Sequence, residues 1–498
     1  MQVASRERAV SQRSVSLPLV LALTSISFFM VSLDALVVVT ALPAIHRSVG
    51  GSIATLEWAV NAYGLTFAAG IVTAAALGDR LGRRRIYVAG LALFTLASAL
   101  CAVAPNSGLL IAFRGLQGLG AAAVTPLALT ILAAAFPVSR RGSIVGIMGG
   151  IGGLAIAGGP LVGGAVVQGL DWHWIFWINV PIGIAAVIGS ALFLPSSRGP
   201  ATRLDLPAVP LIAGAAALIA WALARVGDSG WGDVKGIAAL VAGAALLAGF
   251  VLRERVAAEP MLPLRLFRVR AFSAAGASTF LMSGAIFSAA FLTAQYFQLG
   301  LGYSPLGTGL RLLPWTATPM VVAPLAGALA DRIGARPLLV GGLILQAAGL
   351  AWVASLATTA GSGYGRFVAP LVIAGVGVSM ALPTAPTATL GAVPPSDVGR
   401  ASGVNSTMQR FGAAFGIAVV TAVFTAHGHI GSVASFTAGY RPAMVVSAVI
   451  SLLGAAAAVA VARPRPAAAA PSSVPSALPA QRATGDVRTA VNSGAQAS

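Results

Sequence analysis

The chain has 498 residues, of which 57% are hydrophobic and 9% charged, and its mean hydropathy is +0.89. Soluble domains carry about 25% charged residues, so this composition excludes a water-soluble enzyme and favours a protein that crosses a membrane many times. The formal net charge is +18, but the basic residues form short clusters between apolar runs. That placement is typical of membrane topology rather than of a nucleic-acid-binding surface, so no nucleic-acid partner is expected.

Fourteen apolar windows are long enough to cross a hydrocarbon core of about 30 Å as helices. Helices are expected because every backbone polar group must be paired within the membrane. The fold class predicted is therefore an all-α integral membrane protein with fourteen transmembrane helices. The windows are 17–42, 53–77, 86–105, 108–134, 143–168, 174–194, 207–224, 236–252, 272–298, 305–330, 337–357, 366–390, 400–426 and 442–462.

Arg and Lys residues set the expected orientation. With residues 1–16 in the cytoplasm, most basic residues fall in loops on the cytoplasmic side, as the positive-inside rule requires. Both termini are therefore predicted to be cytoplasmic, in a multi-pass protein of the cell membrane. Residues 463–498 are rich in Ala, Pro and Ser, which predicts a disordered tail.

An internal repeat divides the chain. LGDRLGRR at 77–84 is matched by LADRIGAR at 329–336, and GPLVGGAV at 159–166 is matched by GAAFGIAV at 412–419 at almost the same spacing. Two related six-helix bundles are therefore predicted, and parallel repeats of this kind place a substrate site at their interface. The predicted domains are a cytoplasmic segment 1–16, a bundle 17–194, an inserted helix pair with cytoplasmic linkers 195–271, a bundle 272–462 and the tail 463–498.

Several motifs resemble the major facilitator superfamily, and its fourteen-helix drug:proton antiporter branch in particular. They are LDALVVVTALP at 33–43, GDRLGRRR at 78–85, FRGLQGLGAA at 113–122, GGPLVGG at 158–164 and WHWIFWINVPIG at 172–183. The resemblance covers nearly all of the chain up to residue 462. It implies a multidrug or antibiotic exporter and is not typical of an enzyme. Glu57 and Arg410 depart from the pattern of the family.

Asp34 is the one acid that the sequence places deep in a span. An ionised carboxylate in hydrocarbon costs several kcal/mol, so burial favours proton binding, and Asp34 is the predicted proton carrier. A permanent structural ion pair with Arg114 is the alternative. Arg114 is predicted to be a fixed counter-charge, unless its side chain extends to the outer surface. Glu57 is either a second proton site or a cation contact, or else an interfacial, solvated acid.

Two glycine-containing motifs are assigned conformational roles. The loop signature is predicted to latch the cytoplasmic side, although the positive-inside rule alone explains its arginines; its residues are Gly78, Asp79, Arg80, Gly82, Arg83, Arg84, Asp331, Arg332 and Gly334. The Gly-Pro motif of the fifth helix is either ordinary tight packing or, as the resemblance implies, a hinge and seal. Its residues are Gly159, Pro160, Gly163 and Gly164.

Polar side chains in the second bundle are candidate substrate contacts, with hydrogen bonds between helices as the alternative. They are Asn405, Gln409, Arg410, Gln295 and Arg311, with Gln298 beside them. No nucleotide-binding motif is present, so no cofactor is expected and the energy must come from an ion gradient. A proton entering down 100 mV supplies about 2.3 kcal/mol.

The function predicted is proton antiport that exports lipophilic small molecules, with the lipid bilayer as surroundings and a monomer as the working unit. Alternatives are a proton symporter or metabolite transporter on the same scaffold, and a membrane sensor that transports nothing. A metal site is not expected, because the only cysteine, Cys101, and all four histidines lie apart from any ligand cluster.

Overall fold

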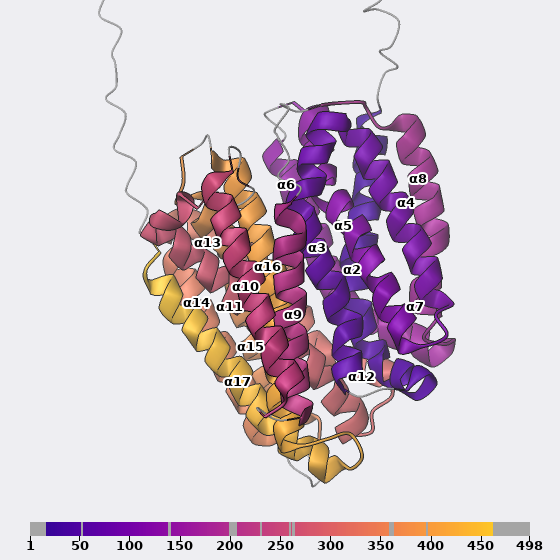
Figure 1. Cartoon of the computed structure of the whole chain (residues 1–498), viewed down its shortest axis with the longest axis vertical. Helices are drawn as coiled ribbons and strands as arrows, with labels where there is room; N and C mark the ends of the chain where they lie inside the picture. The colour runs from indigo at the N-terminus through magenta and orange to yellow at the C-terminus, as the bar shows by residue number, and fades with distance from the viewer. Residues whose placement is uncertain are drawn as a thin grey trace, which may run out of the picture. The chain divides into compact units, whose positions relative to one another are not determined.

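The computed structural model describes residues 16–50, 53–137, 141–198, 207–229, 232–257, 260, 264–357, 363–394 and 397–461. All regular structure in these ranges is helical (Figure 1). The predicted segment 1–16, except Ser16, and the predicted tail 463–498 lie outside them. The helices of the first part of the chain are α2 (Leu17–Val49), α3 (Ile53–Leu81), α4 (Arg83–Ala102), α5 (Ser107–Ala135), α6 (Arg141–Gly169), α7 (Trp174–Trp177) and α8 (Asn179–Phe193).

The remaining helices follow in the same up-and-down manner. They are α9 (Ala208–Ser229), α10 (Val234–Val256), η2 (Leu266–Arg268), α11 (Arg270–Gln295), a π-helical turn η3 (Tyr296–Gly300), α12 (Pro305–Thr316), α13 (Thr318–Ile333), α14 (Ala335–Leu356), α15 (Gly365–Leu390), α16 (Val398–His427) and α17 (Val433–Val459). Several begin at side chains that accept a hydrogen bond from the first turn, namely Asn106, Asp233, Ser304 and Ser432.

Within the described residues, twelve helical segments are long and apolar enough to span a membrane, and a bent pair in α3 makes thirteen. Fourteen spans are therefore not confirmed. The difference lies in the window 207–224, where α9 is a helix of 22 residues but only Pro210–Ile219 counts as a shorter apolar helix. Two expected windows are each built from two helices, because α7 is followed by α8 and α12 by α13.

Two glycines mark corresponding turns. Gly82 separates α3 from α4 with φ of 112°, and Gly334 separates α13 from α14 with φ of 86°. A side chain would strain either position, because L-residues rarely adopt positive φ. Consecutive spans alternate in direction, so both turns lie at one end of the helices, here called the signature end.

The apolar core differs between the two ends. Toward the opposite end, one cluster joins helices from both parts of the chain, including Val37 and Leu42 of α2 with Phe291 and Leu292 of α11. Toward the signature end, α2 to α8 and α11 to α17 bury separate clusters, centred on residues such as Tyr87 and Leu339. The two sets of helices thus share more core at the opposite end.

Candidate functional site: a buried carboxylate–arginine pair

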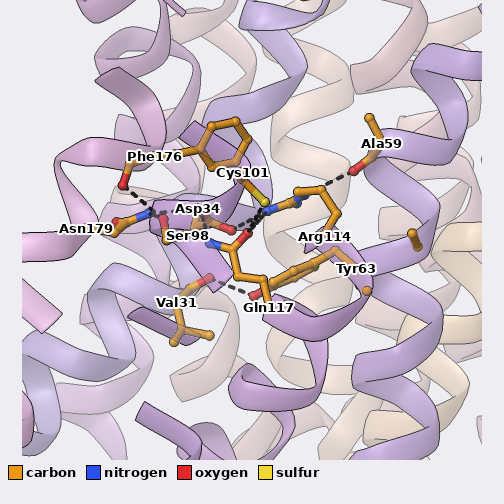
Figure 2. Close-up of polar contacts among 12 residues, drawn as sticks. Val31, Asp34, Ala59, Tyr63, Ser98, Cys101, Arg114, Gln117, Phe176 and Asn179 are labelled. Carbon is orange, nitrogen blue, oxygen red and sulfur yellow. Dashed lines mark hydrogen bonds and ion pairs between the residues drawn. The ribbon is translucent and has the colours of Figure 1, made fainter. Parts of the chain in front are cut away.

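Asp34 lies near the middle of α2 and is 1% exposed. Its Oδ2 is 2.6 Å from Nη1 of Arg114 on α5, in an ion pair that is almost fully buried. Its Oδ1 accepts hydrogen bonds of 2.9 Å from the side-chain amides of Gln117 on α5 and Asn179 on α8. One carboxylate therefore ties three helices together, and three N–H donors compensate its charge (Figure 2).

Arg114 is held on several sides. Its Nε donates to the backbone carbonyl of Ala59 on α3 at 3.0 Å, and Nη1 also donates to Gln117 Oε1 at 2.7 Å. The guanidinium carbon lies 4.4 Å from the centre of the Tyr63 ring, a cation–π distance (Figure 2). Nη2 has no hydrogen-bond partner among the residues that the structure describes. Arg114 is 0% exposed, so it does not extend to the surface.

A second layer of polar groups positions the first. Asn179 also donates to Ser98 Oγ at 3.2 Å, and Ser98 donates to the carbonyl of Phe176 at 2.9 Å. The thiol of Cys101 lies 3.8 Å from Gln117 Oε1. The pair predicted from Asp34 and Arg114 thus belongs to a buried network that extends into α4 and α7.

Glu57 is fully buried on α3, and its Oε1 accepts a hydrogen bond of 2.8 Å from Asn61. The expectation of a solvated interfacial acid is wrong for this side chain. The residue beside it, Trp58, packs against the apolar cluster that includes Phe411 and Ala414 of α16. Enclosure of this helix by its neighbours explains why an acid near the end of an apolar window is shielded from water.

The loop signature makes its contacts within the first set of helices. Arg83 Nε is 2.7 Å from Asp79 Oδ1, and Arg84 Nη1 donates to the carbonyl of Leu194 at the end of α8. A side chain at Gly78 would collide with Leu127 of α5, so this glycine permits a close helix approach. In the second copy Arg332 is exposed, and the side chain of Asp331 lies outside what the structure describes.

The Gly-Pro motif lies against two helices at once. A side chain at Gly159 would collide with Leu36 of α2, and one at Gly163 with Thr40 and the Val37 carbonyl. Gly164 faces the backbone of Pro305 and Leu306 in α12, and Gly309 of α12 faces the backbone of Pro160 in return. The motif therefore lets main chain meet main chain between α6 and α12, which fits the close approach expected of small residues.

The second set of candidates does not form one cluster. Asn405 is buried and accepts hydrogen bonds from Thr279 and Thr389, each at 3.2 Å, which is the expected alternative of helix-to-helix bonding. Gln295 is buried and donates to the carbonyl of Phe291 on its own helix. Gln298, on the π-helical turn, donates to the carbonyl of Thr40 on α2 at 2.8 Å.

The two remaining arginines differ in their surroundings. Arg311 donates to the Gly307 carbonyl at 3.0 Å and lies 3.9 Å from the Tyr303 ring centre. Arg410 lies 4.0 Å from the ring centre of Phe67 on α3, across from its own helix α16. Gln409 is partly buried on α16. Arg410 therefore spans the contact between helices that belong to the two predicted bundles.

Ion pairs outside the spans are structural in kind. Arg225 contacts Asp233, the N-cap of α10, at 2.6 Å, and its hydrogen bond holds the pKa of Asp233 below the ordinary range. Asp171 lies 2.7 Å from the ring of His173. Desolvation is the largest single influence and raises the pKa of Asp171, but the hydrogen bonds from the backbone and ring of His173 together hold it below its ordinary value. Within the described residues no group of three or more His, Cys, Asp and Glu side chains is arranged to hold a metal.

This geometry can be compared with known proteins. The family model described as the Major Facilitator Superfamily matches residues 24–315 and 275–492. The chain belongs to the Major Facilitator Superfamily. It is accordingly a multi-pass membrane transporter and not an enzyme. Its fold agrees with that of a solved POT family transporter in complex with a thioalcohol-conjugated peptide, with a TM-score of 0.66. The two chains are 16% identical, and the match covers 88% of this chain and 94% of that one.

Relatives of higher identity are named as drug or antibiotic resistance proteins, and some of them as export proteins. The tetracenomycin C resistance and export protein of Streptomyces glaucescens is 33% identical, covering 80% of this chain and 74% of its own length. The multidrug resistance protein Stp of Mycobacterium tuberculosis (strain CDC 1551 / Oshkosh) is 36% identical, covering 82% and 76%. The predicted resemblance to the drug- and antibiotic-exporting branch is confirmed at this level.

Sequence reasoning did not single out the amides that hold Asp34, or the ring beneath Arg114. Gln117 lies three residues after Arg114 and therefore on the same helix face, a spacing that could have indicated it. Asn179 lies inside the segment 172–183, whose motif is defined by its aromatic residues. Tyr63 and Gly309 carried no signal, because their importance depends on which helices pack together.

Proposed function

We propose that the protein is a proton-coupled antiporter that exports lipophilic small molecules, and that Asp34 carries the coupled proton. The observation that supports this most is the buried ion pair of Asp34 with Arg114, enclosed by Gln117 and Asn179. An intramembrane ionisable pair is costly to maintain and is functional by default. The names of the relatives support export as the direction.

The chemistry follows from charge compensation. Adding a proton to Asp34 removes its negative charge, so the attraction to Arg114 and the charge-assisted hydrogen bonds to it weaken together. Because these bonds join α2, α5 and α8, protonation changes the relative stability of two arrangements of these helices. Arg114 keeps its charge throughout, since a guanidinium does not deprotonate in proteins.

The transport cycle then alternates between two closures. We infer that the structure corresponds to the state open toward the signature end, because the shared apolar core and the Gln298–Thr40 hydrogen bond lie toward the opposite end. In this proposal the glycine contact between α6 and α12 is the seal of that opposite end. The loop signature latches the signature end in the other state, and Glu57 is a second acid for protons or cations.

The same proposal includes fourteen spans with both termini in the cytoplasm of the cell, and a monomer as the transporting unit. α9 packs along α10, with Gly243 close to Ala215 and Ile219. If α9 is counted as a span together with α10, the number of spans is even. The end of α17 then lies on the same side of the membrane as the start of α2.

The test measures active export and downhill movement separately. Cells without their own exporters receive wild type, Asp34→Asn or the control Asp171→Asn, an acid outside the spans, and are profiled with ethidium, Hoechst 33342, anthracene-9-carboxylate and a panel of antibiotics. For an exported compound, inverted vesicles with an acidic lumen should accumulate it at least about tenfold less with Asp34→Asn. Asp171→Asn should match wild type, and Asp34→Asn should still equilibrate the compound without a gradient.

Three outcomes would contradict the proposal. Asp34→Asn could accumulate substrate as well as wild type, or extrusion could survive full collapse of the gradients by a protonophore. An acidic lumen could also drive the compound out of inverted vesicles, which would indicate symport.

A further inference from the structure

Arg410 is a charged side chain within a span at the contact between α16 and α3. It lies 4.0 Å above the ring of Phe67 and is partly exposed. Among the residues that the structure describes it has no hydrogen-bond or ion-pair partner. Arg114, by contrast, has Asp34, and Arg311 has the Gly307 carbonyl.

An anionic group fits the N–H donors of Arg410. A guanidinium carries five N–H donors at its edge and no acceptor, and in an apolar span those donors are costly when nothing accepts from them. The Phe67 ring covers one face of the guanidinium, but it cannot accept two parallel hydrogen bonds from the N–H groups at the guanidinium's edge. Planar oxyanions, carboxylates above all, fit that edge with two parallel hydrogen bonds.

Aromatic rings continue from Arg410 toward the Asp34 pair. Phe67 lies 6.0 Å from Tyr63 in an edge-to-face arrangement, and Tyr63 lies beneath Arg114 at 4.4 Å. The Tyr63 hydroxyl donates to the carbonyl of Val31 on α2, which fixes the ring. On α16 the next turn carries Phe415, which packs on Phe280 of α11 at 5.5 Å. Phe67 is 1% exposed, so its ring supports the guanidinium of Arg410 from the buried side, whereas Phe415 on the same helix as Arg410 is 39% exposed.

We propose that Arg410 is a specificity-determining residue that binds the anionic group of aromatic organic acids, with the buried Phe67 ring holding the guanidinium in place. The inference rests on the proposed transport function and names its substrate class. Two arginines with aromatic neighbours, Arg410 and Arg114, then lie at the two ends of one row of rings, and only Arg114 has an acid of the protein as its partner.

The test is an equilibrium binding measurement without any gradient. Three probes share one ring system: anthracene-9-carboxylate, neutral anthracene-9-methanol and cationic 9-(aminomethyl)anthracene. Binding to the purified full chain in nanodiscs is followed by energy transfer from tryptophan. Wild type should prefer the carboxylate over the alcohol by about tenfold or more, the factor that one charge-assisted contact gives.

The variants separate charge from packing. Arg410→Gln should remove the preference for the carboxylate and leave the alcohol bound as before, while Arg410→Lys should keep part of it, because lysine offers a point charge and no fork. Phe67→Leu removes the ring that supports the guanidinium and should therefore reduce the preference for the carboxylate. Arg225→Gln is the matched control, since Arg225 also lies over a ring, that of Trp221, but outside the site and paired with Asp233.

Each result decides the matter. Equal binding of carboxylate and alcohol by wild type overturns the proposal, as does an Arg410→Gln variant that folds and loses all probes equally. If Arg410→Gln does not fold, as judged by thermal unfolding and size exclusion, Arg410→Lys and Phe67→Leu carry the test. Asp34→Asn should retain the carboxylate preference, so this inference and the proton assignment can fail independently.

Discussion

The helices α2–α8 and α11–α17 bury polar groups of different kinds. In the first set Asp34, Arg114, Gln117 and Asn179 form a charged network. In the second set the buried contacts are neutral, such as Ser288 with Ser447 at 2.9 Å and Thr293 with Tyr440 at 3.1 Å. The first set thus buries the ionisable groups that the proposed proton coupling requires, whereas these neutral contacts of the second set hold helices together.

The largest effect should come from separating the two charges. Arg114→Leu leaves the Asp34 carboxylate buried without its counter-charge, which costs about 3–5 kcal/mol of unfolding free energy. Tyr440→Phe, the control in the neutral set, removes one hydrogen bond with Thr293 and should cost about 1 kcal/mol. Chemical unfolding in detergent, followed by intrinsic fluorescence, measures both. Equal losses of unfolding free energy from the two substitutions would contradict the proposed difference between the charged and the neutral set.

An intermediate effect should arise where the two sets meet through backbone. Gly309→Ala places a methyl group against the carbonyl of Pro160, so α12 cannot approach α6 as closely. Active transport should fall about tenfold or more, while each set of helices keeps its own contacts. Gly153→Ala on α6 is the control, because nothing lies within 4 Å of the added carbon. Unchanged transport by Gly309→Ala would show that this contact is not a working seal.

The smallest effect belongs to the helix pair outside both sets. The pKa of Asp233 is lowered in the folded state, so its ion pair with Arg225 stabilises the fold at pH values above the unfolded pKa of about 3.9. This stabilisation is lost as the pH falls through the lower, folded pKa. Thermal unfolding of wild type and Asp233→Asn should therefore differ slightly at neutral pH and converge below about pH 4. A difference that persists there would assign the effect to the lost N-cap of α10 instead.

Much of the fold could be predicted because hydrocarbon leaves few choices. Apolar length indicated the helices, and the recurrence around Gly82 and Gly334 indicated the two corresponding turns, both of which adopt positive φ. Asp34 and Arg114 could be paired because an acid and a base in apolar windows must compensate each other. The window 207–224 is not confirmed as a span, since its apolar helix is only Pro210–Ile219.

The environment of each polar side chain could not be predicted in the same way. Glu57 is buried and Asn405 is committed to Thr279 and Thr389, and both facts depend on which helices pack together rather than on local pattern. Arg410 was one of five polar candidates of equal standing. In the structure, its position above Phe67, on a helix of the other set, distinguishes it from the rest.

The close approach of α6 to α12 has a consequence for the proposed cycle. Gly164 and Gly309 each meet a carbonyl of the facing helix, so no interlocked rotamers have to disengage when the helices part. Little apolar side-chain surface becomes wet at these points, and the energy difference between joined and parted helices stays small. In the proposed cycle such a joint opens and closes without depending on the shape of the cargo.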